Sequence, residues 1–328
     1  MEEQSKLLSM DTTAPSKRRL EQLTRHLTSA SYDTSKYKTT WDHVIPAGTR
    51  KIKYAPEEWA MRCKLAAAYR VARYLGWDQI VFNHITAKVP GSETERDGPH
   101  FLINPLGLRF DEVTAASLLK VTVDGVIKDV GTNAGGLFRQ GFVIHAAIHA
   151  VRHDAVCVWH CHHEDTAAVC MTKHGLLPLS QEAIAMIPLV AYHPFEGTAN
   201  DMAEQPRLQH NIGQYKKILL LNNHGPLTLG KSIDESFYLM YNVCRSATYQ
   251  QKALAAVGGD LDQVHVPSTQ QLKAMYERGR KGNMSHQSNY DEGAGVKASP
   301  ELVFRAMCRI VEEMYGVEQI YDVENVYV

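Results

Sequence analysis

Three histidines stand at the ends of two apolar segments that favour buried strands. His160 and His162 belong to VCVWHCHH (156–163), and His224 follows the apolar run of LLLNNHGPLTLG (219–230). Because side chains alternate between the faces of a strand, His160 and His162 share a face. Imidazole nitrogens bind zinc at about 2.0–2.1 Å, and three protein ligands leave a position for water or substrate. The spacing predicts a catalytic site for one divalent metal ion.

The competing interpretation is that the HxH pair is only two partly buried polar residues. His224 weighs against it, because it also ends a predicted strand and precedes Gly225, which would let the chain turn sharply. Open α/β sheets place ligands at the carboxyl ends of their strands, where these histidines are expected.

Hydrophobic periodicity predicts the elements that must hold these residues. The predicted helices span Pro56–Leu75, Gly141–Val151, Thr166–Lys173, Asp234–Ala256 and Glu301–Tyr315. The predicted strands span Ile80–Val81, Ile85–Val89, Phe101–Ile103, Leu119–Val123, Val126–Val130, Ala155–His162 and Lys217–Leu221, and residues 222–227 are expected as a loop. Together these elements indicate an α/β fold with a largely antiparallel sheet flanked by helices.

Three regions are expected along the chain. Residues 1–45 are polar and lack periodicity, which predicts a flexible N-terminal arm. Residues 46–260 hold the predicted sheet and should form the catalytic domain. Residues 261–328 form a C-terminal extension, with a flexible segment rich in Gly, Lys and Ser near 278–295 and a helix after it.

Composition excludes several classes of protein. The formal net charge of −1 gives no reason to expect a nucleic-acid or membrane-surface partner. No apolar run reaches the roughly 18 residues that a membrane span needs. The six cysteines form no CxxC pair and lie mostly in apolar segments, which fits buried thiols in a reducing compartment. A cytoplasmic protein is therefore expected, with Cys161 as a core thiol on the strand face opposite the ligands.

Several stretches together resemble the class II aldolase/adducin family, from about Trp59 to Gly259. They are FNHITAKVPG (82–91), INPLGLRFDEVT (103–114), GFVIHAAIHAVRHDAVCVWHCHH (141–163), GLLPLSQEAIAM (175–186) and LLNNHGPLTLG (220–230). The amino-acid sequences of these stretches are closer to the adducin-like branch of the family than to its sugar-phosphate aldolases.

The resemblance implies a three-layer α-β-α fold around a mostly antiparallel nine-stranded sheet. It also implies a homotetramer with sites at subunit interfaces, and a divalent ion bound by His160, His162 and His224. Adducin itself has the fold but lacks these metal ligands, so their presence here favours an enzyme over a cytoskeletal binding module.

Two departures from the family's sugar-phosphate aldolases change the expected chemistry. Their catalytic glutamate lies four residues before the helix histidine matched here by His145, and this chain has Gly141 there. The groups that bind the substrate phosphate are replaced at Asn83-His84, Asn104–Gly107 and Arg139-Gln140. A phosphorylated sugar is therefore not the expected substrate.

Decarboxylation needs an electron sink but no general base, because the departing CO₂ leaves its electrons behind. Aldol cleavage, in contrast, needs a base on the hydroxyl. A metal ion supplies such a sink by stabilising an enolate. We therefore expect a decarboxylase of a small oxygenated carboxylic acid. The family includes metal-dependent decarboxylases, some of them acting on aromatic or tropolone-like carboxylates in secondary metabolism, so the resemblance implies an aromatic, tropolone-like or 2-oxo acid and a role of that kind. Zinc is the expected metal, with manganese or iron as alternatives.

Three other functions stay open. They are an aldolase or retro-aldolase acting on a non-phosphorylated substrate, a non-haem Fe(II) oxygenase, and a non-catalytic adducin-like binding module.

His84, Glu164 and Glu182 are the candidates for acid–base catalysis. His84 replaces a substrate-binding asparagine of the family; it is either a proton donor or carboxylate partner, or a hydrogen-bonded loop histidine. Glu164 would face the ligands if their strand continued, but it also suits a capping charge at a helix start. Glu182 matches an acidic position of the adducin-like branch, and a role at a helix N-terminus competes with one near the metal.

The candidate substrate-binding residues are Lys88, Asn104, Arg139 and Gln140. The cations of Lys88 and Arg139 suit a carboxylate, with solvation at the surface as the competing interpretation. Asn104 and Gln140 stand at positions of the family's phosphate pocket.

Two further hypotheses concern residues outside this set. His145 and His149 lie four apart on a predicted helix and share a face, where we expect packing beneath the site rather than ligation. In the C-terminal region, Tyr290 or Tyr321 is a candidate to cap the site of a neighbouring subunit.

Overall fold

Eight strands form one sheet in the order β4-β3-β2-β1-β5-β8-β7-β6. The computed structural model describes residues 51–133, 135–197, 205–280 and 299–328. The strands are β1 (His84–Lys88), β2 (His100–Ile103), β3 (Leu119–Thr122), β4 (Ile127–Asp129), β5 (Cys157–His160), β6 (Val190–His193), β7 (Ile218–Leu221) and β8 (Gly225–Gly230). All neighbouring strands are antiparallel except β6 and β7, which are parallel.

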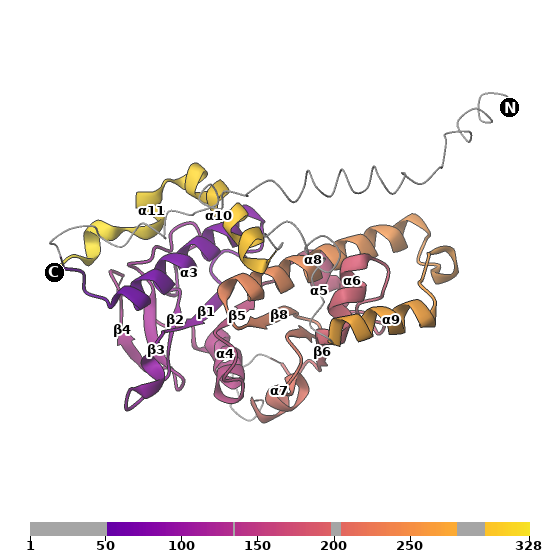
Figure 1. The fold of residues 1–328 in the computed structure, drawn as a ribbon, viewed down its shortest axis with the longest axis horizontal. Helices are drawn as coiled ribbons and strands as arrows, with labels where there is room; N and C mark the ends of the chain where they lie inside the picture. Colours follow the sequence, from indigo (N-terminus) through magenta and orange to yellow (C-terminus); the bar gives the residue numbers. More distant parts are fainter. Residues whose placement is uncertain (1–50, 134, 198–204, 281–298) are drawn as a thin grey trace, which may run out of the picture.

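Helices cover both faces of this sheet (Figure 1). On one face pack α3 (Pro56–Tyr74), α8 (Ile233–Ala256) and α10 (Pro300–Tyr315), and on the other α4 (Arg139–Val151) and α7 (Gln205–Ile212). The other α-helices of the described residues are α5 (Glu164–Cys170), α6 (Gln181–Met186), α9 (Thr269–Arg280) and α11 (Val317–Tyr321). The predicted three-layer α/β fold is confirmed, with eight strands in the described part of the chain where nine were expected.

The two faces of β5 separate the core from the site. Trp159 packs in the core beneath α3 and α8, whereas Val158 packs in a second core with α4 and α7. His160 therefore shares the face of Val158, as strand alternation requires. Cys161 continues the opposite face, and its sulfur lies 3.5 Å from Met240 Sδ. The expectation of a core thiol is confirmed.

Local capping places the helix that follows this strand. The His163 side chain accepts a hydrogen bond from the backbone N–H of Thr166, so α5 begins at Glu164, two residues earlier than predicted. Glu164 thus occupies the first turn of a helix, where a negative charge is favourable.

One predicted strand is wrong. Ile80–Val81 forms a turn, in which the backbone N–H of Phe82 donates to the carbonyl of Gln79 and Ile80 has φ 54°. Two adjacent apolar residues are too short a pattern to distinguish a strand from a turn. The strand begins instead at His84.

The C-terminal region packs into the main core. Phe304 and Cys308 of α10 are buried against α3 and α8, and the Tyr321 hydroxyl donates to Glu312 at 2.5 Å. Because the Tyr321 ring is 0% exposed, the hypothesis that it caps a neighbouring site is wrong. Tyr290 and the predicted N-terminal arm lie outside the described residues.

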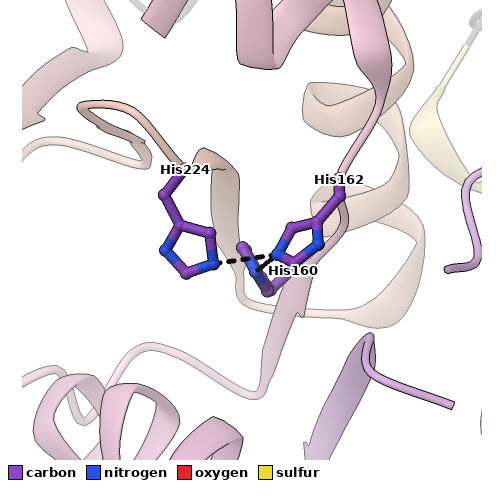
Figure 2. A group of neighbouring side chains, drawn as sticks. All are labelled: His160, His162 and His224. Carbon is purple, nitrogen blue, oxygen red and sulfur yellow. Dashed lines mark hydrogen bonds between the residues drawn. The ribbon is translucent and has the colours of Figure 1, made fainter. Parts of the chain in front are cut away.

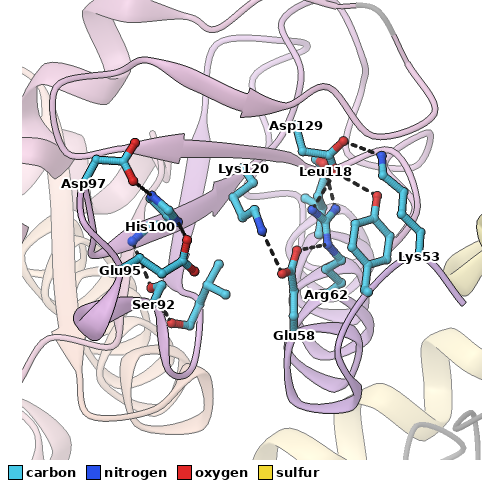
Figure 3. A network of polar contacts seen from close by, with 12 residues as sticks. Lys53, Glu58, Arg62, Ser92, Glu95, Asp97, His100, Leu118, Lys120 and Asp129 are labelled. Atoms are coloured by element: carbon cyan, nitrogen blue, oxygen red, sulfur yellow. Dashed lines mark hydrogen bonds and ion pairs between the residues drawn. The ribbon is translucent and has the colours of Figure 1, made fainter.

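Arg62 ties α3 to the β3–β4 side of the sheet (Figure 3). Its guanidinium is fully buried, and Nε donates to Glu58 at 2.9 Å. The other nitrogens donate to the Leu118 carbonyl at 2.8 Å and to Asp129 at 3.0 Å. The guanidinium therefore neutralises two carboxylates that have little access to water.

Arg62→Met should lower the free energy of unfolding by about 3 kcal/mol, because it removes the fully buried cation between Glu58 and Asp129, which then keep only the partly exposed Lys120 and Lys53 as cationic partners. The matched control is Arg73→Met, because Arg73 pairs with Asp78 with 45% of its side chain exposed. That change should cost less than about 1 kcal/mol. Urea unfolding followed by circular dichroism measures both, and equal losses would contradict the role of Arg62.

Candidate metal centre

The three predicted ligands converge on one point (Figure 2). His160 ends β5, His162 lies two residues further on, and His224 lies between β7 and β8. The Nε2 atoms of His160 and His162 are 3.0 Å apart, and those of His162 and His224 are 2.8 Å apart. The pairing of β5 with β8 brings these distant parts of the chain together at one edge of the sheet.

A short hairpin between β7 and β8 aims His224 at this point. Its turn is closed by a hydrogen bond from the His224 N–H to the carbonyl of Leu221 at 3.1 Å. The left-handed residue is Asn223, with φ 57°, and not Gly225 as expected. Gly225 instead opens β8, where a Cβ would lie 2.7 Å from the carbonyl oxygen of Cys161. Gly225 is therefore required for the close approach of β8 to the backbone that follows β5, and not for the turn.

Hydrogen bonds behind two of the rings fix their tautomers. His160 Nδ1 lies 2.9 Å from the carbonyl oxygen of Pro226, and His162 Nδ1 bonds to Oε1 of Gln79. Both oxygens can only accept, so each Nδ1 carries the proton and donates it. Each Nε2 is left with a bare lone pair. A hydrogen-bond acceptor behind a metal-binding histidine is the usual means of fixing its tautomer.

Two lone pairs facing each other at 3.0 Å repel unless a cation lies between them. Burial discourages a proton in that position, because it holds the pKa of His160 well below its ordinary value and lowers that of His162 to about 4. Burial also lowers the pKa of His224. The rings are therefore neutral, which is the metal-binding form. The donor set fits a divalent ion held by three imidazole nitrogens.

A second group of possible ligands, Glu95, Asp97 and His100, lies near β2 (Figure 3). Its two carboxylates are about half exposed, and Asp97 pairs with Lys128 at 2.7 Å. A lysine ammonium in the group opposes a bound cation, so the histidine cluster is the better candidate.

The histidine cluster forms one wall of a cavity of about 300 Å³. Aromatic rings supply much of the remaining wall. None of the described residues lining this cavity is lysine or arginine, so a phosphate would meet no fixed side-chain cation there. The lining includes Phe82, His84, Phe138, Gln140, Gly141, His193, Phe195, Glu196 and Asn222.

Among the other predicted site residues, His84 and Gln140 line this cavity. His84 comes from β1, where it pairs with His160 of β5, and the two rings are 5.2 Å apart between centroids. Its Nδ1 bonds to His145 at 2.7 Å, which leaves Nε2 for a ligand in the cavity. Arg139 instead borders a neighbouring hollow, which Gln140 also reaches.

The structure places the other candidates away from the cavity. Lys88 donates to the carbonyl of His153 at 2.9 Å, and Asn104 accepts from the Tyr69 hydroxyl at 2.8 Å. Glu164 is exposed in the first turn of α5, and Glu182 is half-buried in the first turn of α6. Their proposed roles in catalysis and substrate binding stay predictions.

Several lining residues had no signal in the sequence. His193 ends β6, a strand that was not predicted, and Phe195 and Glu196 follow it. The parallel pairing of β6 with β7 brings their carboxyl ends to the same sheet edge as the ligands. Recognising Val190–His193 as a strand would have pointed to His193.

Known proteins match this chain over its central part. A sequence model of the class II aldolase and adducin N-terminal domain matches residues 63–251. The chain belongs to the class II aldolase/adducin family. A crystal structure of an aldolase II superfamily protein from Pseudomonas syringae superposes with a TM-score of 0.69 at 35% identity, covering 81% of this chain and 98% of that one. The family resemblance seen in the sequence motifs is confirmed.

Both adducins and a bacterial protein of the aldolase class 2 type are similar to this chain. This chain is 44% identical to alpha-adducin of Rattus norvegicus over 65% of its own length but only 28% of that protein. It is 40% identical to a Pseudomonas aeruginosa protein named provisionally as an aldolase class 2 protein, over 69% of this chain and 82% of that one. None of the described helices has the length and hydropathy needed to cross a membrane.

His162→Ala should remove most of the bound metal while the fold survives, because it deletes the ligand whose Nε2 is closest to the other two. Zinc is measured by inductively coupled plasma mass spectrometry after dialysis, and the fold by circular dichroism. His153→Ala is the control, since His153 is exposed and distant from the cluster. Full zinc content in His162→Ala would show that the site is wrong.

The metal-free protein should lose stability as the pH falls from about 6.5 to about 4. Burial lowers the pKa of His84 and His149 to about 3 and that of His162 to about 4, whereas histidines in the unfolded chain titrate near 6.5. The unfolded state therefore binds more protons in this window, and stability falls with pH. Unfolding midpoints in urea between pH 4 and pH 8 measure this. A midpoint constant from pH 7 to pH 5 would contradict it.

Proposed function

We propose that this protein is a metal-dependent carbon–carbon lyase that decarboxylates a small oxygenated carboxylic acid. An aromatic, tropolone-like or 2-oxo acid is the substrate class we favour. The convergence of three neutral imidazoles beside a cavity of small-molecule size carries this proposal. A divalent ion bound there, zinc by preference for nitrogen ligands in a tetrahedral site, would supply stabilisation of negative charge on substrate oxygens.

The side chains around the cavity favour decarboxylation over aldol cleavage. Aldol cleavage needs a base for the substrate hydroxyl, and the family's glutamate position holds Gly141. Glu196 lines the cavity, but it accepts from Arg207 at 2.7 and 2.8 Å, and this pairing lowers its pKa. A carboxylate engaged in this way is a weak base. In decarboxylation the C–C bond breaks heterolytically, CO₂ departs, and the electron pair stays on the substrate, so no base is needed.

The shape and chemistry of the cavity support a small, largely apolar substrate. A volume of about 300 Å³ suits a single ring or short chain. Phe82, Phe138 and Phe195 offer aromatic surface, and His84 offers a polar atom beside the cluster. The carboxylate of the substrate would lie toward the histidines, and its apolar part against the phenylalanine rings.

A non-catalytic, adducin-like binding module is the second candidate, and the 44% identity to alpha-adducin favours it. It differs from the first in not requiring a bound metal. For either function we propose a homo-oligomer, a tetramer by the family resemblance, in the cytoplasm.

A screen for CO₂ release tests the proposed chemistry. Protein loaded with zinc, manganese or iron is incubated with aromatic, tropolone-like and 2-oxo acids, and the His162→Ala protein serves as control. We expect metal-dependent CO₂ release from one substrate class, lost by at least about 100-fold in the control. Aldehyde or ketone formation without CO₂ would support an aldolase, and oxygen consumption with iron alone an oxygenase. No bound metal and no turnover would support the binding module.

A further inference from the structure

The imidazole of His84 occupies the space that a side chain at position 141 would need. A Cβ added to Gly141 would lie 2.1 Å from His84 Nε2 and 2.9 Å from Cδ1 of Phe138. No residue larger than glycine fits beside this histidine. The loss of a glutamate at Gly141 and the presence of a histidine at position 84 are therefore linked by packing.

A chain of hydrogen bonds leads from His84 into the protein. His84 Nδ1 lies 2.7 Å from His145 Nε2, and His145 Nδ1 lies 2.7 Å from the Thr86 hydroxyl. That hydroxyl also lies 2.9 Å from His149 Nε2. All four side chains are buried, with exposures of 0 to 4%.

The secondary structure explains why these groups meet. His84 and Thr86 are two residues apart on β1 and share a face, and α4 packs against this strand. Gly141, His145 and His149 are spaced by four on α4, so they form one stripe along the helix. The stripe presents its glycine to the His84 ring and its two histidines to the polar atoms beneath it.

His149, at the end of this series furthest from His84, determines the direction of its hydrogen bonds. His149 Nδ1 is buried, and the nearby carbonyl of Ala155 lies outside the geometry of an ordinary hydrogen bond to it. An Nδ1–H would therefore lack a well-placed acceptor, which is rare for a buried N–H, so we place the proton of this ring on Nε2, where it donates to Thr86. The Thr86 hydroxyl then donates to His145 Nδ1, and His145 Nε2–H donates to His84 Nδ1. The remaining proton of His84 is on Nε2.

His145 and His149 are neutral. Burial lowers the pKa of His149 to about 3, and it holds the pKa of His145 well below its ordinary value. Each of these two rings therefore carries one proton, and since His84 Nδ1 accepts the proton of His145, the ring proton of His84 lies on Nε2.

We propose that His145, Thr86 and His149 are positioning residues that hold His84 as a fixed Nε2–H donor to a substrate oxygen in the cavity. The donor lies beside the ligand His160, on the wall where the substrate's oxygen atoms would gather. A preorganised donor at developing negative charge is worth about 10²–10³ in rate in known enzymes. The identity of the bound oxygen rests on the proposed decarboxylase function, whereas the protonation pattern of the chain does not.

Neutron crystallography of the zinc-loaded protein tests the pattern without any substrate. We expect deuterium on Nε2 of His84, His145 and His149, and on the Thr86 hydroxyl in line with His145 Nδ1. Deuterium on Nδ1 of His84 would overturn the proposal. That reversed pattern would follow if the carbonyl of Ala155, near His149, accepted from its Nδ1.

Variants test whether the chain matters to the reaction. Thr86→Val keeps a β-branched side chain suited to a strand but removes the hydroxyl, and it should lower kcat about 10–100-fold with zinc content unchanged. Thr86→Ser should restore most of the activity. Gly141→Ala, which displaces the His84 ring, should retain zinc and lose kcat to a similar extent, and it serves if Thr86→Val does not fold.

A failure of the positioning role can be distinguished from a failure of the proposed decarboxylase function. Unchanged kcat in both Thr86→Val and Gly141→Ala would overturn the positioning role even if CO₂ release is confirmed. If no acid is decarboxylated but the neutron map shows the expected protons, the proposed decarboxylation is wrong, and the assignment of His84 Nε2–H as a fixed donor is supported.

Discussion

Behind His160 and His162, acceptor oxygens hold the ring protons on Nδ1 and leave two Nε2 lone pairs facing each other at 3.0 Å. Free in water, such rings would rotate apart or take up a proton. Here the backbone of β5 and β8 and the Gln79 side chain fix their orientation, and burial opposes protonation. A cation between the two lone pairs would remove this repulsion. The proposed chemistry in the cavity and the proposed role of His84 both depend on such a metal site.

Antiparallel pairing brings the parts of this site together. β5 lies between β1 and β8, so His84, His160 and the turn before Gly225 meet at one edge of the sheet. Two glycines permit approaches that a side chain would block. Gly225 lets β8 start against the backbone of Cys161, and Gly141 lets α4 lie against the His84 ring. The spacing of the ligands is thus a property of backbone contacts as much as of the histidines.

The sequence was sufficient to predict helices with a long periodic pattern and ligands of a chemically specific residue type. The helix expected over Pro56–Leu75 ends within one residue of the observed boundary, and the HxH pair together with His224 identified residues that converge in space. β8 was missed because Gly225 and Pro226 suggest a loop, and only the pairing with β5 and β7 makes this segment a strand. β6 was missed because its four residues show no clear alternation of apolar and polar side chains. The cavity-lining residues that follow β6 were missed for the same reason. The contact between His84 and Gly141 depends on how α4 lies on β1, which residue spacing within either element does not determine.

The most direct test of the metal centre is a crystal structure of the purified protein with anomalous data collected on either side of the zinc absorption edge. We expect one anomalous peak per chain, at about 2.0–2.1 Å from Nε2 of His160, His162 and His224. Absence of a peak there after incubation with zinc, or a peak only at Glu95, Asp97 and His100, would contradict this account.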